Sequence, residues 1–152
     1  MRAKVIVIEA AMAADPVKVL GDPTAVRLEL PVKHIFAKGV YARELFLPKG
    51  VMLTGEIHKY PQINIMSKGD LAVSIGGRVR RIKADKGPII IAAPAGTKRI
   101  AHAYADTIWT TIHATNLTDV DEIAEYFIAP TDAMYEAFLA KTQIKEIAPC
   151  HG

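Results

Sequence analysis

The central part of the chain, residues 41–116, alternates short runs of β-forming residues with turns that contain glycine, proline or aspartate. Such a pattern is typical of an antiparallel jelly roll or small β-barrel, and we expect residues 41–116 to form one. The pair Gly76-Gly77 supplies the permissive backbone of a tight hairpin. The strands we expect are 43–47, 51–60, 62–67, 71–75, 78–83, 88–93, 98–104 and 107–114.

After Asn116 the hydrophobic period changes to about 3.6 residues, which predicts two C-terminal α-helices in the segment 117–152. Thr118 is a candidate N-cap for the first helix, which ends before Pro130. Thr131 is a candidate N-cap for the second. Each helix carries an apolar stripe, so we expect the pair to cover an apolar surface. The predicted fold class is therefore all-β with added helices.

The first 40 residues are apolar and are interrupted by Pro16, Pro23 and Pro31, which excludes one long helix. We predict that residues 1–40 form an N-terminal arm that packs on a neighbouring subunit. The alternative is that the arm and the C-terminal helices close the ends of one barrel. A chain of 152 residues has the length of one domain, so arm, barrel and helices are expected to fold as one unit.

The composition excludes several classes of function. With 51% hydrophobic and 23% charged residues, the chain is typical of a globular protein. Its net charge of +3 is too small and too scattered for a nucleic-acid surface, and the basic run 78–83 is more typical of a solvated sheet face. The single cysteine, Cys150, cannot form an internal disulfide, and we assign it no role. Since we find neither a membrane-spanning segment nor a secretory signal, we expect no membrane partner.

A candidate site begins in residues 55–62, GEIHKYPQ. This run resembles the first motif of the cupin superfamily, G-x5-H-x-H-x3/4-E-x6-G, which supplies histidines and a glutamate to one metal ion. Gly69 matches the closing glycine, and counting back from it places Gln62 at the glutamate position. His58 then stands at the second histidine position and Glu56 at the first. Because residues two apart on a strand share a face, we expect Glu56 and His58 to project together into the barrel beside Gln62.

Residues 94–99, PAGTKR, resemble the second cupin motif, G-x5-P-x-G-x2-H-x3-N. Gly87 lies one residue further upstream than this motif requires. The histidine position is Arg99 and the asparagine position is Ala103. A guanidinium stays protonated and cannot bind a metal cation, so the resemblance departs from the family pattern where it matters most.

Arg99 leads to two hypotheses for the pocket. In the first, Glu56 forms an internal ion pair with Arg99, the side chains of His58 and Gln62 surround the pair, and no metal binds. In the second, Glu56, His58 and Gln62 hold one divalent transition metal together with a further strand histidine.

Two histidines on later strands are available for the second hypothesis. Strand alternation turns His102 outward if Arg99 points inward, and it leaves the side of His113 open. The predicted pocket consists of Glu56, His58, Gln62, Arg99 and His113.

Beyond these motifs, the chain resembles small cupin-like proteins encoded in tailed-bacteriophage genomes over about residues 33–128. The segments that carry the resemblance are 41–46, 55–59, 67–69, 94–99 and 106–113. In that family an arginine at the position of Arg99 is usual. The resemblance implies a viral source and, with the altered ligand set, favours a non-enzymatic structural or accessory protein of the virion, in head or tail assembly or decoration. Such a protein has no catalytic residues and no cofactor. Its partners would be other virion proteins and further copies of itself, as a homo-oligomer in the virion, assembled in the host cytoplasm.

The alternative is a cytoplasmic, metal-dependent cupin enzyme of the isomerase or dioxygenase type that acts on a small molecule. A metal-free form of this alternative uses His58 as an acid or base and Arg99 to bind an anionic sugar or carboxylate.

Overall fold

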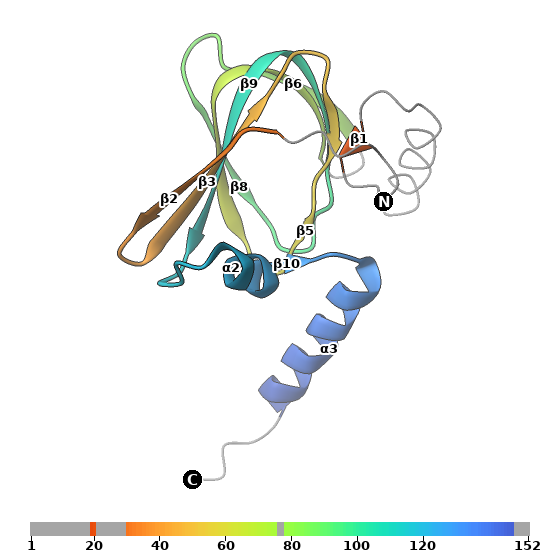
Figure 1. The fold of residues 1–152 in the computed structure, drawn as a ribbon. Helices are drawn as coiled ribbons and strands as arrows, with labels where there is room; N and C mark the ends of the chain where they lie inside the picture. Colours follow the sequence, from red (N-terminus) through yellow and green to blue (C-terminus); the bar gives the residue numbers. More distant parts are fainter. Residues whose placement is uncertain (1–18, 21–29, 76–77, 148–152) are drawn as a thin grey trace.

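The structure is a computed structural model and describes residues 19–20, 30–75 and 78–147. Within them the chain forms an eight-stranded sheet, a two-stranded sheet and two helices (Figure 1). Most of the predicted N-terminal arm, as well as Cys150, lies outside the described residues. The strands are β1 (Val19–Leu20), β2 (Val32–Ala37), β3 (Val40–Leu47), β4 (Met52–Thr54), β5 (Ile57–His58), β6 (Gln62–Ile75), β7 (Arg78–Lys83), β8 (Ile89–Ala93), β9 (Ile100–Ala114) and β10 (Ile128–Ala129). The helices are α2 (Val120–Phe127) and α3 (Asp132–Ile147).

The larger sheet curls into a barrel of mostly antiparallel strands. Along one path its order is β1-β4-β9-β3-β2, and β6 lies beside β9 and also pairs with β7 and β8. Only the short β1–β4 pair is parallel among the described strands. The smaller sheet pairs β10 with β5. The predicted fold class, an all-β jelly roll with two C-terminal helices, is confirmed.

Residues 62–75 form one strand, β6, and the turn expected around Gly69 is a bulge instead. The register against β9 shifts between Met66 and Leu71. Gly69 has a φ of +122°, and a Cβ there would lie 2.1 Å from the Thr107 Oγ1 atom, so only glycine fits. The bulge changes which residues face inward, from Asn64 and Met66 before it to Leu71 after it.

The expected strand 51–60 is divided into β4 and β5 at Gly55 and Glu56. At this break the Gly55 N–H donates to the Arg99 carbonyl oxygen at 2.7 Å. β4 belongs to the larger sheet, whereas β5 pairs with β10. The strand alternation that was expected to carry Glu56 and His58 onto one face is therefore interrupted between them.

Two further strand boundaries differ from the expectation. The runs 98–104 and 107–114 form one strand, β9. On one side β9 pairs first with β4 and then with β3, and on the other side it pairs with β6 along both parts. The strand therefore continues without a turn where its partner changes. Within the expected arm, β2 pairs with β3 through a short turn in which Gly39 has a φ of +79°. The barrel therefore begins earlier than residue 41.

Both predicted helices form. The N-cap of α2 is Asp119 rather than Thr118, and its carboxylate accepts from the N–H groups of Asp121 and Glu122 at 3.0 and 2.9 Å. Thr131 caps α3 as predicted, since its Oγ1 accepts from the Met134 N–H at 3.2 Å. No helix in the described ranges is long and apolar enough to cross a membrane.

The two helices make different contacts with the barrel. α2 lies across one end of it, where Phe127 and Ile123 pack with Tyr41 of β3 (Figure 1). α3 packs through Tyr135 on Ile57 and Ala129 and then extends away from the barrel. The predicted cover of an apolar surface is made mainly by α2.

Candidate functional site

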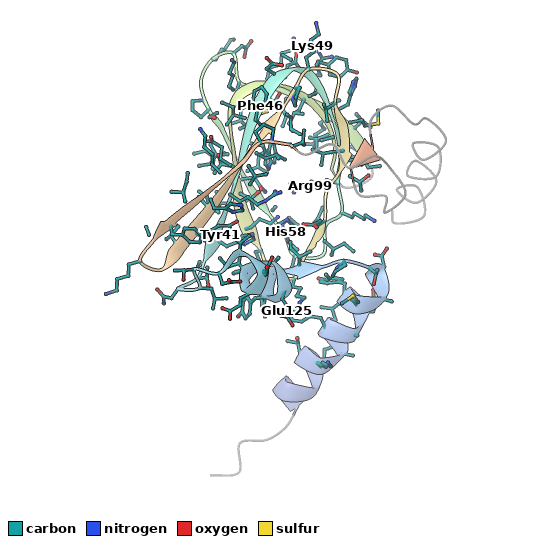
Figure 2. The ribbon with its side chains drawn as sticks, in the orientation of Figure 1. Tyr41, Phe46, Lys49, His58, Arg99 and Glu125 are labelled. Carbon is teal, nitrogen blue, oxygen red and sulfur yellow. The ribbon has the colours of Figure 1, made fainter. Side chains whose placement is uncertain are left out.

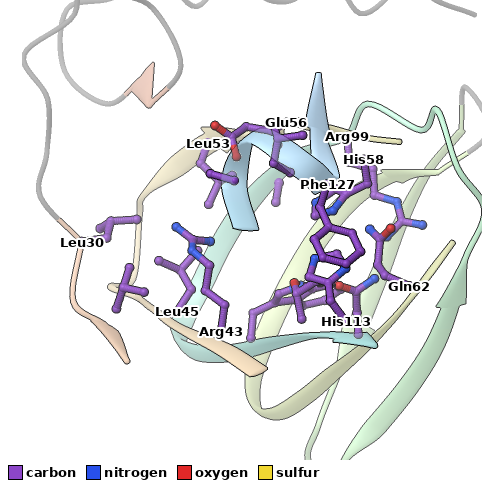
Figure 3. Close-up of a pocket in the computed structure, with 18 of the residues that line it drawn as sticks. Leu30, Arg43, Leu45, Leu53, Glu56, His58, Gln62, Arg99, His113 and Phe127 are labelled. Carbon is purple, nitrogen blue, oxygen red and sulfur yellow. Dashed lines mark hydrogen bonds between the residues drawn. The ribbon is translucent and has the colours of Figure 1, made fainter. Parts of the chain in front are cut away.

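A cavity of about 380 Å³ lies inside the barrel, and α2 closes one end of it (Figure 3). Strand alternation builds its polar wall: β9 contributes Trp109, Thr111 and His113, and β6 contributes Gln62 and Asn64. The volume falls within the range of about 300–1,000 Å³ that is common for small-molecule sites.

The opposite part of the cavity is aliphatic. Figure 3 shows Leu30, Leu45 and Leu53 on the side away from His58. Further leucine and valine side chains of β6 continue this surface. The cavity thus has a polar wall and an apolar part, which suits a molecule with both kinds of surface.

All five predicted pocket residues line the cavity, but only four of them lie together. His58, Gln62, Arg99 and His113 gather on one wall (Figure 3), and Figure 2 shows His58 and Arg99 inside the barrel above α2. Glu56 lies apart from this wall, on the side of Leu53, and its side chain is exposed.

The predicted ion pair between Glu56 and Arg99 is wrong. The structure has no ion pair between these two described residues, and the Arg99 Nε atom is buried without a hydrogen-bond partner. The physical reason is the interruption of the strand between β4 and β5, which leaves Glu56 outside the strand that carries His58.

Unpaired polar atoms are concentrated on the polar wall. Six buried side-chain atoms that line the cavity make no hydrogen bond to the described residues: Thr54 Oγ1, His58 Nδ1, Gln62 Oε1, Asn64 Nδ2, Arg99 Nε and His113 Nδ1. Buried polar groups are normally satisfied, because an unmade hydrogen bond costs about 1–3 kcal/mol. In a cavity of this volume these atoms can bond to water or to a polar ligand.

One of these groups is held in place by its neighbours. The Asn64 Oδ1 atom accepts from Trp109 Nε1 at 3.2 Å and from Thr111 Oγ1 at 2.9 Å. The amide oxygen is thereby used, and the Nδ2 group remains as a donor. The wall therefore presents fixed rather than freely rotating donors.

The two cavity histidines are neutral at pH 7. Burial, followed by the charges of His113, Arg43 and Arg99, lowers the pKa of His58 from 6.5 to about 4. Burial alone lowers the pKa of His113 to about 4. The His113 ring stacks on Phe127 of α2 with centroids 4.1 Å apart, and the centroid of the His58 ring lies 5.2 Å from that of His113. The helix therefore takes part in keeping water from these rings.

The charge on the wall is positive. Burial lowers the pKa of Arg99, but a guanidinium remains protonated near pH 7. Arg43 of β3 contributes a second, more exposed guanidinium to the cavity, on the side of Leu45 (Figure 3). Among the described lining residues Glu56 is the only acid, and it lies apart. A negatively charged ligand would complement this wall.

The residues present do not fit the metal ion of the alternative hypothesis. The described part of the chain contains no group of three or more histidine, cysteine, aspartate or glutamate side chains placed to hold one. Of the proposed ligands, His58 and Gln62 share the wall with the Arg99 cation, which repels a divalent ion, and Glu56 is elsewhere.

The other two histidine expectations have clear outcomes. His113 faces inward and is buried. His102 does not line the cavity, and its ring packs beside that of Tyr104 at 4.5 Å, in agreement with the alternation argument.

Solved structures similar to this chain include cupin-domain proteins. The structure of KdgF from Halomonas sp. matches with a TM-score of 0.50 at 18% identity, over 64% of this chain and 88% of that one. The Cupin_2 domain of an XRE family transcriptional regulator from Enterobacter cloacae matches with a TM-score of 0.46 at 14% identity, over 57% of this chain and 98% of its own. An RmlC-like cupin family protein with a double-stranded β-helix fold from Methanocaldococcus jannaschii has a TM-score of 0.46 at 14% identity, over 61% and 84% of the two chains.

Identities this low bear on the fold alone, and the jelly roll described above is of the same type. No protein-family model matches the sequence, and no curated protein matches it.

The sequence reasoning did not find several lining residues. Arg43 begins the expected strand 43–47, and the observed strand β3 starts earlier and places Tyr41 two positions before it, on the same side. Asn64 lies two positions after Gln62, so alternation could have placed it on the same side, but only the register against β9 puts it opposite Thr111 and within reach of Trp109.

Proposed function

We propose that this protein binds a small organic anion inside its barrel, without a metal ion, and serves as a binding module rather than as an enzyme. The observation that carries the proposal is the polar wall, where buried atoms without hydrogen-bond partners among the described residues surround the half-buried guanidinium of Arg99, which has no carboxylate partner there. A carboxylate or phosphate group of the ligand would accept from Arg99 and from the Asn64 amide.

The aliphatic part of the cavity supports an organic ligand rather than a bare inorganic ion. Leu45, Leu53 and their neighbours offer surface for a carbon skeleton, whose burial contributes about 25 cal/mol per Å². The polar wall then orients the charged end of the molecule.

The histidines support binding more than catalysis. A general base works best when its pKa lies near the working pH. With a pKa of about 4, His58 is a weak base at pH 7. As a general acid it is protonated in only about one molecule in a thousand. A neutral imidazole is nonetheless a good hydrogen-bond donor or acceptor for a bound anion.

The test is a set of binding measurements with matched acids and neutral analogues. Purified protein is titrated by calorimetry with aliphatic and aromatic carboxylates, sugar acids and organic phosphates, each beside its uncharged amide or alcohol. We expect at least one acid to bind while its neutral analogue does not. Arg99→Met should weaken that binding by about 10- to 100-fold, because it removes a charged hydrogen bond.

The matched control is Arg80→Met, since Arg80 is exposed on β7 and does not line the cavity. It should leave the affinity unchanged. Two results contradict the proposal: a stoichiometric transition metal in elemental analysis of the native protein, or no acid that binds better than its neutral analogue.

The second candidate is a structural or accessory role in a bacteriophage virion. It rests on the sequence resemblance and is favoured by α3, which extends from the barrel and offers surface to another protein (Figure 1). Mass spectrometry of purified particles tests it directly. Finding the protein in stoichiometric amounts in the particle supports this role, and finding it only in the soluble fraction of the host contradicts it.

A further inference from the structure

Two arginine side chains reach the cavity from different parts of the fold. Arg43 projects from β3, and Arg99 directly precedes β9 on the polar wall. Figure 3 shows them on opposite sides of the cavity, Arg43 beside Leu45 and Arg99 beside His58. After burial, which is the largest cause, the charges of both arginines contribute to the low pKa of His58. The cavity therefore presents two separate cationic groups to one enclosed space.

The register of the sheet shows how Arg43 relates to the polar wall. Arg43 lies opposite Thr111 on β9, and Thr111 lies opposite Asn64 on β6, so all three line the cavity in one row. With neighbouring strands about 4.8 Å apart, the Cα atoms of Arg43 and Asn64 are separated by about 10 Å. The Thr111 hydroxyl between them already donates to the Asn64 Oδ1 atom at 2.9 Å. It has no further hydrogen for a ligand, so the two donor regions remain separate.

Neither guanidinium is neutralised within the described part of the chain. None of the ion pairs found there includes Arg43 or Arg99. Glu56 lines the same cavity, but it is exposed and pairs with neither arginine. A ligand with one acidic group would compensate one guanidinium and leave the other, whereas a ligand with two acidic groups would compensate both.

We infer that the ligand of this cavity carries an acidic group at each end, as an aliphatic dicarboxylate does. The inference rests on the proposed function and names the class of anion. One carboxylate accepts from Arg99 and from the Asn64 amide on the polar wall, and the other accepts from the exposed Arg43. The carbon chain between the two carboxylates lies along Leu45 and Leu53.

The volume of the cavity agrees with a molecule of this kind. A volume of about 380 Å³ equals that of about a dozen molecules of liquid water, at about 30 Å³ each. Adipate and its homologues up to suberate have a comparable number of non-hydrogen atoms. A much shorter diacid such as malonate would contact only one of the two guanidinium groups, so the affinity should depend on the length of the diacid.

The experiment compares ligands of equal length that differ at one end. The full chain is titrated by calorimetry with each aliphatic dicarboxylate from malonate to suberate. Each is compared with the monocarboxylate and the ω-hydroxy acid that have the same number of carbon atoms. The best dicarboxylate should bind at least about 10-fold more tightly than both of these, because it forms a second charged hydrogen bond. Malonate should show no such preference.

Variants of Arg43 test the second contact. Arg43→Met should reduce the preference for the best dicarboxylate over its monocarboxylate to less than about 3-fold, because the outer charged hydrogen bond is lost. Arg43→Lys should retain most of the preference, since lysine keeps the positive charge. The matched control is Arg80→Met, at an exposed position on β7 that does not line the cavity, and it should retain the full preference. Circular dichroism checks that each variant is folded.

The possible results separate this inference from the proposed function. The inference is overturned, while the proposed function stands, if an organic acid binds but no dicarboxylate is preferred over its monocarboxylate. A preference that persists in folded Arg43→Met overturns it as well, because Arg43 then does not hold the second acidic group. If no organic acid of any class binds better than its uncharged analogue, the proposed function fails and this inference fails with it.

Discussion

The half-buried Arg99 side chain has a buried Nε atom with no hydrogen-bond partner among the described residues, and this affects stability. A buried charged group without a hydrogen bond at Nε destabilises the fold, and a flexible apolar side chain of similar length avoids that penalty. We expect Arg99→Met to raise the free energy of unfolding without ligand by about 1 kcal/mol, even as it weakens anion binding. Urea titration measures the change.

Arg80→Met is again the control, because Arg80 is solvent-exposed, and its effect should stay within about 0.5 kcal/mol. If Arg99→Met lowers stability instead, the guanidinium has a stabilising partner and the site is not as we describe it.

His58 makes the stability of the protein depend on pH in a defined window. Its pKa is 6.5 when unfolded and about 4 when folded, so the unfolded chain binds the proton first as the pH falls. The stability that comes from the neutral ring is present above pH 6.5 and is lost between about 6.5 and 4. By linkage, this loss is at most about 3.4 kcal/mol.

The measurement is urea unfolding at pH 7, 5.5 and 4.5 for the native protein and for His58→Gln. The variant should lose less stability across this window. His34→Gln serves as control, since His34 is exposed and its Nδ1 atom lies 2.8 Å from the Tyr41 hydroxyl, its side-chain hydrogen-bond partner within the described part of the chain. Equal slopes for the native protein and His58→Gln would show that His58 does not titrate as expected.

At this scale the sequence predicted part of the site. Motif spacing located His58, Gln62 and Arg99, and the structure brings them to one wall. It misplaced Glu56, because a strand break between two positions of one motif is invisible to alternation. The contribution of Asn64 depends on the register of β6 against β9, which a single sequence does not contain.

Strand β6 contains a bulge at Gly69, where only glycine fits. Gly69→Ala combines a backbone conformation unfavourable to alanine with a collision against Thr107, so we expect a loss of about 3 kcal/mol or more. Gly87→Ala is a close control: Gly87 also has a φ of +122° but nothing within 4 Å, so only the backbone penalty of about 1–2 kcal/mol applies.

Thermal and urea unfolding of both variants separate the two contributions. Equal losses at Gly69 and Gly87 would mean that the contact with Thr107 has no role.

Element types were more predictable than element boundaries. The β-rich runs and the two helices follow from local periodicity, and all of the runs lie in strands of the described structure or across their breaks. Local periodicity does not predict that two expected runs merge into β6 and two into β9. Each of these strands changes its pairing partner along its length while its backbone continues. Glycine and aspartate at such joins look the same as at true turns.

For the molecule as a whole, α2 covers one end of the barrel and, through Phe127, keeps water away from the cavity histidine His113. Phe127 packs on His113 and is 5% exposed. Phe127→Ala should destabilise the protein by about 3–5 kcal/mol and admit water to the cavity. The pKa of His113 should then rise from about 4 toward 6.5, which NMR titration of the imidazole detects.

Met134→Ala is the comparison, because Met134 is 53% exposed on α3 and does not line the cavity. It should change neither quantity appreciably. If the pKa of His113 stays low in Phe127→Ala, the barrel alone excludes water from the His113 ring and Phe127 is not needed for this.

The pairing of β5 with β10 ties the barrel wall to the stretch of chain between the two helices. His58 lies opposite Ile128 in this two-stranded ladder, and Ile57 lies opposite Ala129. A fragment that stops at residue 116 therefore contains every polar side chain of the wall yet lacks the backbone partner that holds one of them in position. We expect such a truncated protein to fail to retain the anion in equilibrium dialysis. The barrel segment would then need the helical segment in order to bind the anion, although the sequence divides readily into arm, barrel and helices.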